Sequence, residues 1–283
     1  RGSMSLPQSL AAEYAYYGID VAEFAGFDYD RGKVDEYLTS LLVAYLGSSE
    51  GRPDFEQSGS SGGSGEPFMR VYYAIKGLKA LNGELSAEQA ETATATCLQL
   101  GDELLAPAAP DAAGEWRYAA LAGRELGLRY PEGVAGKIAG GAASALAYMA
   151  QGAADVSPED LLGIWVAQSE SEPQLTKEKA LEYLASIYDA ESGAYTRLGR
   201  PLQTETVPAE GEPSSLPEPL SERVAIGEIT ATYAAAEFLE LLGEDLPDVE
   251  KTLEFVMRCK CAFGFSPTTE LPGGNDFLKT TLT

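Results

Sequence analysis

The chain has 283 residues and 45% hydrophobic content, which suffices for a sizeable core in one large domain or two small ones. Its net charge of -24 produces a surface that repels nucleic-acid phosphates and anionic lipids. The sequence contains no histidine, which excludes Ser-His-Asp triads, Cys-His dyads and nearly all zinc hydrolase chemistry. Any proton transfer must therefore use Asp, Glu, Tyr, Lys or Cys.

The helical period dominates the sequence, and alternating strand patterns are nearly absent. Asp30 is expected to cap the second helix, and glycines 83, 127 and 243 are expected to end three others. The Gly-Ala-rich stretch 139–147 predicts close helix packing. In chain order, the pattern predicts helices over 10–17, 33–46, 68–81, 87–105, 116–126, 133–151, 158–168, 176–188, 228–242 and 248–259.

Two segments interrupt these helices. Residues 58–65 (SGSSGGSG) form a flexible Gly/Ser loop whose composition resembles an engineered linker. Residues 200–221 carry five prolines and are too polar to pack, so they form either a mobile lid or a plain surface excursion. Residues 1–4 resemble the remnant of an expression tag, and we expect residues 5–283 to form a single domain.

Cysteine content and hydropathy indicate the cellular environment. The three cysteines, Cys97, Cys259 and Cys261, give no disulfide framework, and Cys-x-Cys is shorter than zinc-knuckle spacing. We interpret all three as reduced and structural, with Cys259 and Cys261 at a helix end. The sequence has no signal peptide and no apolar run of 18 residues, so we predict a cytoplasmic protein without stable membrane insertion.

A Tyr-Ala…Leu…Gly pattern recurs along the chain. Its copies begin at Tyr73, Tyr118 and Tyr233, and a fragment begins at Phe277. The spacing predicts helix pairs of about 45 residues, five or six in number. A single amphipathic pair cannot bury its apolar face, so the pairs must stack, either as an open solenoid or as a closed ring.

A second recurring element follows the second helix of a pair. Its copies are Asp-Ala-Glu-Ser-Gly-Ala-Tyr at 189–195, Cys-Lys-Cys-Ala-Phe-Gly-Phe at 259–265 and a looser one at 50–55. This element resembles the Asp-x-x-Gly-Gly-Phe/Trp turn of the protein prenyltransferase β-subunit and squalene-cyclase superfamily. The Tyr-Ala helices resemble the inner helices of that superfamily. The resemblance covers most of residues 30–283 and implies an all-α (α/α) toroid, with an inner helix ring around an apolar cavity and an outer ring.

The same resemblance indicates where a site would lie. In such a toroid the inner-helix N-termini converge at the cavity mouth, where free N–H groups carry partial positive charge. Each acid there could also be a helix cap, and each aromatic residue could also belong to the core. The candidate catalytic acids are Glu228, Glu115 and Asp276; the candidate substrate-binding residues are Glu66, Arg70, Tyr73, Trp116, Arg117, Tyr118, Thr232, Tyr233 and Phe277.

The sequence departs from the family at its chemical motifs. Prenyltransferases of this type hold zinc with Asp, Cys and His, but this chain has no His and no Cys at an inner-helix start. The cyclase motif Asp-x-Asp-Asp-Thr-Ala is reduced at 226–231 to one acid followed by Thr-Ala. The Asp-x-Asp at 28–30 precedes an outer-type helix, and Asp-Asp-x-x-Asp is absent. We therefore expect no metal and no cofactor.

These observations lead to one expected function and two alternatives. The first is a metal-independent cyclase or isomerase acting on a flexible, largely apolar terpenoid, polyene or polyketide-like substrate, with Glu or Asp as the proton shuttle. The second is a non-catalytic module that binds a small molecule or a protein on the same toroid. The third is an open helical-repeat protein that binds partners along a concave face. No pattern in the sequence assigns an oligomeric state.

Overall fold

The computed structural model describes residues 11–25, 28–46, 67–106, 114–150, 156–168, 174–196, 229–261 and 264–265. These residues are mostly helical, which confirms the all-α class. The chain divides into two compact units. Unit 1 comprises residues 1–144 and 163–169, and unit 2 comprises residues 145–162 and 170–283. The predicted tag remnant, the 50–55 turn copy and the 58–65 and 200–221 loops lie outside the described residues.

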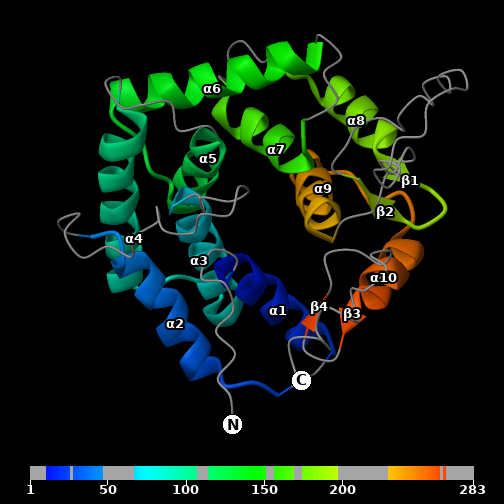
Figure 1. Ribbon diagram of the computed structural model, residues 1–283, viewed down its shortest axis with the longest axis horizontal. Coiled ribbons are helices and arrows are strands. Elements are labelled where there is room, and N and C mark those ends of the chain that lie inside the picture. Colours follow the sequence, from blue (N-terminus) through cyan, green and yellow to red (C-terminus); the bar gives the residue numbers. More distant parts are fainter. Residues whose placement is uncertain are drawn as a thin grey trace, which may run out of the picture. The chain divides into compact units, whose positions relative to one another are not determined.

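The helices follow the predicted order along the chain, and four short strands that were not predicted accompany them (Figure 1). The elements are α1 (Ala11–Ala25), α2 (Arg31–Val43), α3 (Pro67–Asn82), α4 (Ala87–Leu100), the π-helical turn η1 (Gly101–Leu105), α5 (Glu115–Leu126), α6 (Glu132–Ala150), α7 (Pro158–Ala167), α8 (Lys177–Ser186), β1 (Tyr188–Asp189), β2 (Ala194–Tyr195), α9 (Ile229–Leu242), α10 (Val249–Arg258), β3 (Lys260–Cys261) and β4 (Gly264–Phe265).

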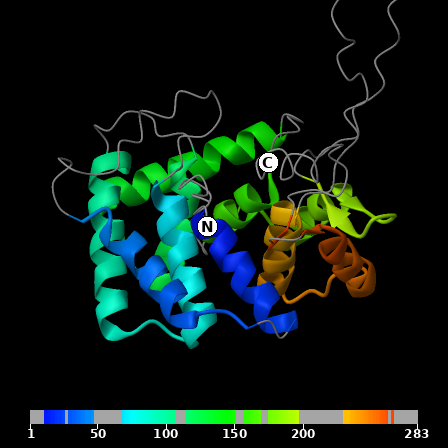
Figure 2. The ribbon, with the colours of Figure 1, turned by 60° about the horizontal axis from the view of Figure 1, so that its bottom comes forward.

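In unit 1 the helices form two rows that pack on each other. Helix α3 contacts α1 on one side and α5 on the other, while α2 and α4 pack together and against α3 (Figures 1 and 2). The row α1–α3–α5 therefore includes both Tyr-Ala helices of this unit, as the repeat predicts. Close approach depends on small residues: a Cβ added at Gly77 of α3 would lie 2.7 Å from Leu38 Cδ1 of α2.

In unit 2 both α8 and α10 lead directly into a two-stranded antiparallel hairpin. Tyr188 pairs with Tyr195 in the first hairpin, and Lys260 pairs with Phe265 in the second. Helix α9 contacts α8 and β2, and α10 contacts β2. The two recurring elements at 189–195 and 259–265 thus each contain an antiparallel strand pair. The predicted position of Cys261 at a helix end is wrong, because this residue lies in strand β3.

Local signals set most helix ends. The Asp30 side chain accepts a hydrogen bond from Lys33 N at 3.1 Å, which confirms it as the N-cap of α2. Gly83, Gly127 and Gly243 have φ of +78°, +60° and +70°, the left-handed conformation that ends a helix. The predicted first helix was too short, because apolar positions continue past Gly18 and Ile19 is buried.

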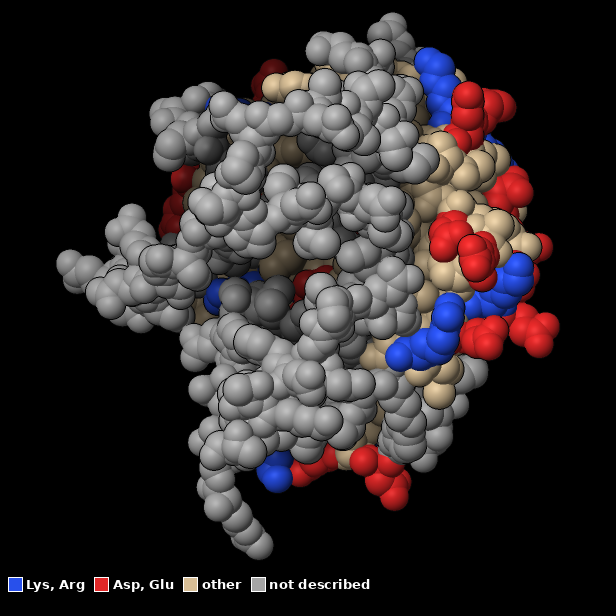
Figure 3. Space-filling view, turned by 45° about the vertical axis from the view of Figure 1, so that its right-hand side comes forward, with Lys and Arg blue, Asp and Glu red and all other residues tan. Residues whose placement is uncertain are grey.

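The surface reflects the acidic composition. On the described part of the face in Figure 3, Asp and Glu side chains lie beside Lys and Arg side chains, with uncharged residues between them. Among the described residues, no helix combines the length and the apolar character that a membrane crossing requires.

Candidate functional site

Five tyrosines from three helices of unit 1 gather into one group, which we call the tyrosine cluster. It comprises Tyr16 and Tyr17 of α1, Tyr72 and Tyr73 of α3, and Tyr118 of α5. The ring centroids of Tyr73 and Tyr118 lie 6.1 Å apart, and those of Tyr17 and Tyr73 lie 5.7 Å apart. The hydroxyl oxygens of Tyr17 and Tyr73 are 3.1 Å apart and share a hydrogen bond. All but Tyr16 are buried.

The Tyr-Ala repeat explains how two of these rings meet. Tyr73 and Tyr118 occupy equivalent repeat positions on the neighbouring helices α3 and α5. The alanines that follow them, Ala74 and Ala119, are fully buried. A methyl side chain at these positions lets neighbouring elements approach closely. The repeat therefore places equivalent aromatic rings against each other.

Positively charged groups lie against the edge of the cluster. Lys76 Nζ is 5.4 Å from the centroid of Tyr16, and Arg117 Cζ is 4.7 Å from the centroid of Tyr118. The Arg70 side chain, one turn from the start of α3, is buried. A tyrosine face attracts positive charge because its quadrupole is negative above the ring. The rings of Tyr16 and Tyr118 therefore already contact positively charged side chains of this chain.

Glu115, a predicted catalytic acid, contacts the start of a neighbouring helix. It is the first residue of α5 and is 5% exposed, and its Oε2 accepts a hydrogen bond from Phe68 N of α3 at 3.0 Å. This N–H is one of those that an isolated helix start leaves without a partner. The carboxylate is also stabilised by the positive end of the α3 dipole. The contact is a helix-capping one, made between two helices rather than within one.

The next two predicted residues contact α6 and α7. A Cβ added at Gly141 of α6 would lie 2.3 Å from Trp116 Cγ, so the indole lies directly on that glycine. A Cβ added at Gly163 of α7 would lie 2.7 Å from Arg117 Cβ. The Gly141 contact falls within the stretch 139–147 for which close helix packing was predicted, whereas a Cβ added at Gly140 would have no atom within 4 Å. The Trp116 ring lies on α6, outside the tyrosine cluster.

Thr232 and Tyr233, the two described site residues of α9, belong to unit 2. Thr232 Oγ1 accepts a hydrogen bond from Tyr195 N at 3.0 Å, which ties α9 to strand β2. Tyr233 packs against a buried cluster that includes Ile229 and Phe255. Both residues therefore support the β1–β2 hairpin. The remaining predicted site residues lie outside the described part of the chain, namely Glu66, Glu228, Asp276 and Phe277.

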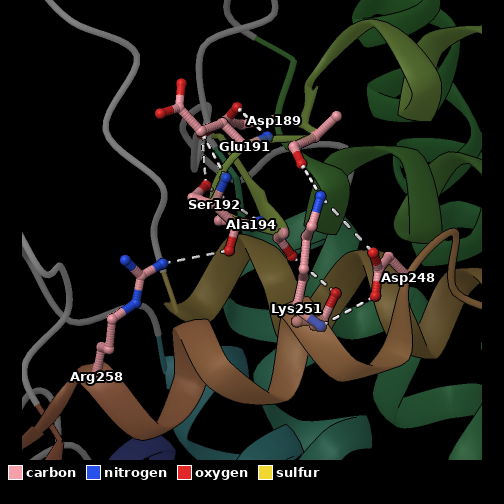
Figure 4. Close-up of polar contacts among 10 residues, drawn as sticks. Asp189, Glu191, Ser192, Ala194, Asp248, Lys251 and Arg258 are labelled. Carbon is pink, nitrogen blue, oxygen red and sulfur yellow. Dashed lines mark hydrogen bonds and ion pairs between the residues drawn. The ribbon is translucent and has the colours of Figure 1, made fainter.

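The β1–β2 hairpin is held by side chains of α10 (Figure 4). Lys251 Nζ donates to Ala190 O at 2.9 Å, Thr252 Oγ1 donates to Gly193 O at 2.7 Å, and an Arg258 guanidinium nitrogen lies 3.4 Å from Ser192 O. Gly193 has φ +77°, and a Cβ there would lie 2.5 Å from the Lys251 carbonyl carbon. The glycine of this turn is therefore needed for both its conformation and its close contact.

The Asp189 side chain stabilises the same turn through hydrogen bonds to other residues of the turn. Its carboxylate accepts hydrogen bonds from Ser192 Oγ at 2.5 Å and from Glu191 N at 3.0 Å. The Ser192 hydroxyl bond is the main cause that lowers the pKa of Asp189, with smaller contributions from backbone N–H groups. The acid and the glycine that suggested the family turn thus both have a structural role here.

Sequence reasoning did not identify three members of the tyrosine cluster as site residues, namely Tyr16, Tyr17 and Tyr72. The doublets Tyr16-Tyr17 and Tyr72-Tyr73 were the available signal. Both rings of each doublet lie against one tyrosine of a neighbouring helix: Tyr16 and Tyr17 against Tyr73, and Tyr72 and Tyr73 against Tyr118. A tyrosine doublet in the sequence can identify members of such a cluster only when the neighbouring helices are known.

Neither metal nor thiol chemistry has support among the described residues. No group of three His, Cys, Asp or Glu side chains in these parts of the chain is arranged to hold a metal ion. Cys97 and Cys259 are buried free thiols. Burial raises the pKa of Cys97 to about 12 and that of Cys259 to about 11, so neither forms a thiolate readily.

Comparison with known proteins found no matching family model, no matching curated protein and no matching solved structure.

Proposed function

We propose that this chain binds a flexible, largely apolar small molecule at the tyrosine cluster and carries out a metal-independent cyclisation or isomerisation there. In this proposal the helix pairs close into the (α/α) toroid that the family resemblance implies. The observation that carries the proposal is the convergence of Tyr16, Tyr17, Tyr72, Tyr73 and Tyr118 from three helices. Such rings combine a large apolar contact area with a negative face.

The proposed chemistry uses these two properties together. A folded polyene, epoxide or polyketide-like chain develops positive charge as it cyclises, and ring faces stabilise that charge. A Glu or Asp side chain supplies and removes the proton. The Glu115 carboxylate caps α3. Glu228 and Asp276 are the other acids that the sequence proposes for this role, and they lie outside the described residues.

A second candidate function is a non-catalytic binding module on the same fold. Two observations favour it. Tyr17, Tyr72, Tyr73 and Tyr118 are 3–6% exposed and pack on one another, as core residues do. The described member of the proposed acid set, Glu115, makes a structural contact.

Binding and turnover measurements separate the two functions. Purified chain is incubated with isoprenoid alcohols, terminal epoxides and polyketide-like chains of increasing length. Binding is followed by tyrosine fluorescence, and products are followed by mass spectrometry. We expect saturable binding that Tyr73→Leu weakens by about tenfold or more, which corresponds to the loss of a buried aromatic contact.

The controls are chosen from the same chain. Tyr148→Leu changes a tyrosine that is 62% exposed on α6, so it should leave binding unchanged. Turnover that Glu228→Gln or Asp276→Asn abolishes supports the enzyme. Binding without any product supports the module, and absence of binding to every compound contradicts both.

A further inference from the structure

Helix α10 has two apolar faces, and only one of them is covered. Thr252, Phe255 and Cys259 are buried on the face that packs against the hairpin and α9. On another face Val249, Leu253 and Met257 are 52%, 41% and 43% exposed. We call these three residues the α10 stripe. They are four positions apart, so they share one side of the helix over roughly 12 Å of its length.

Three of the six large apolar side chains that are exposed in the described part of the chain lie in the α10 stripe. The other large apolar side chains exposed in the described part of the chain are Val43, Leu46 and Tyr148, on or near α2 and α6. Single exposed apolar residues are ordinary on a protein surface. Three in register on one helix are typical of a binding face.

One edge of the stripe is acidic. Glu250 and Glu254 are exposed beside it, and neither forms an ion pair with a described residue. The basic residues of α10 are directed elsewhere. Lys251 and Arg258 point toward carbonyl oxygens of the β1–β2 hairpin (Figure 4). The helix therefore exposes apolar and negative groups on one surface.

We infer that the α10 stripe is a docking surface for an amphipathic helix of another protein, one with its own apolar stripe and a Lys- or Arg-rich edge. Anchors at i, i+4 and i+8 match the spacing by which helices bind one another. Met257 can adapt its shape to different partners. The acidic edge selects a basic partner by charge complementarity. The contact is small, so it suits a transient complex with Kd in roughly the micromolar range.

A second copy of this chain fits the stripe less well. In an antiparallel two-fold pair, the Glu250 and Glu254 side chains of both copies lie on the same side of the interface, where they repel one another. Each copy also carries a net charge of -24. The same negative charge opposes docking on an anionic membrane.

The test uses the full chain and a labelled synthetic helix made of Leu and Lys in amphipathic order, with fluorescence anisotropy as the measurement. We expect this peptide to bind at least about tenfold more tightly than a scrambled peptide of the same composition or a Leu/Glu helix. Leu253→Ser should weaken binding about tenfold, because it removes the central anchor. The double variant Glu250→Gln, Glu254→Gln should weaken binding and reduce its salt dependence.

Val43→Ser is the matched control, because Val43 is also 52% exposed but lies on α2. It should leave binding unchanged, and circular dichroism should show that every variant remains folded. Unaltered binding by Leu253→Ser, or equal binding of the scrambled peptide, would overturn the inference. So would sedimentation showing self-association that Leu253→Ser abolishes, or Leu253-dependent binding to neutral phosphatidylcholine vesicles.

Discussion

Units 1 and 2 alternate helices in a similar way but join them by different means. In unit 1 the neighbouring helices α1, α3 and α5 meet directly, through tyrosine rings. In unit 2 a hairpin joins α9 and α10: Tyr195 N bonds to Thr232 of α9, and Gly193 O accepts from Thr252 of α10. The comparison shows that the repeat specifies helices, whereas the residues between the helices specify how they connect.

The first turns of helices α2 and α10 also show that one local sequence pattern can make different contacts. Each begins with an Asp cap followed three residues later by Lys, as Asp30–Lys33 and Asp248–Lys251. Lys33 reaches its own cap at 3.1 Å, with an 82% exposed side chain. Lys251 Nζ lies farther from its own cap, at 3.8 Å, and also donates to Ala190 O of the hairpin at 2.9 Å. An identical local pattern thus has a different use where a hairpin lies within reach.

The largest expected effect is loss of an aromatic ring from unit 1. Tyr73→Ala should lower the free energy of unfolding by about 4 kcal/mol, because Tyr73 contacts rings from both neighbouring helices. Urea unfolding followed by tryptophan fluorescence measures this effect, since both tryptophans, Trp116 and Trp165, lie in unit 1. Tyr148→Ala is the exposed control. A cost below about 1 kcal/mol for Tyr73→Ala would mean that the cluster is loosely packed.

In unit 2 the most sensitive position should be the hairpin glycine. Gly193→Ala should cost about 3 kcal/mol, because it combines an unfavourable positive φ with a Cβ 2.5 Å from the Lys251 backbone. Gly127→Ala is the control, with positive φ but no atom within 4 Å of its Cβ, and should cost only about 1 kcal/mol. Circular dichroism in urea measures both variants. Equal costs would show that close contact with α10 contributes nothing.

Capping between helices should matter more than capping within one. Glu115→Ala in unit 1 leaves the buried Phe68 N–H without its acceptor and should cost about 2 kcal/mol. Asp248→Ala in unit 2 removes a cap from its own helix and should cost about 1 kcal/mol. Glu115→Gln keeps a side-chain oxygen and should recover part of the loss. Thermal unfolding of the three variants, compared at one pH, checks this order.

The smallest effect concerns the pH dependence of unit 2. Hydrogen bonds lower the pKa of Asp189 in the folded state below its ordinary value. Asp189 therefore stabilises the hairpin fully above the unfolded pKa of about 4 and loses that contribution as pH falls through the lowered folded pKa. The urea midpoints of the wild type and Asp189→Asn should differ at pH 7 and converge toward pH 2. A constant difference across this range would contradict the role of the charged carboxylate.

Helix positions could be predicted from the sequence to within a few residues at most ends. Asp30, Gly83 and Gly127 act through hydrogen bonds or backbone angles within a few residues of themselves, so the local sequence contains the information. The hairpins could not be predicted in this way. Their strands are two residues long, too short to display an alternating pattern.

The sequence by itself determined the all-α class, the alternation of helices and the equivalence of Tyr73 with Tyr118. Only the tertiary structure decided what the candidate site residues touch. Glu115 bonds to Phe68 across 47 residues, and Thr232 bonds to Tyr195 across 37. The physical reason is that caps and helical periods arise between residues close in the chain, whereas these contacts depend on which helices become neighbours after folding.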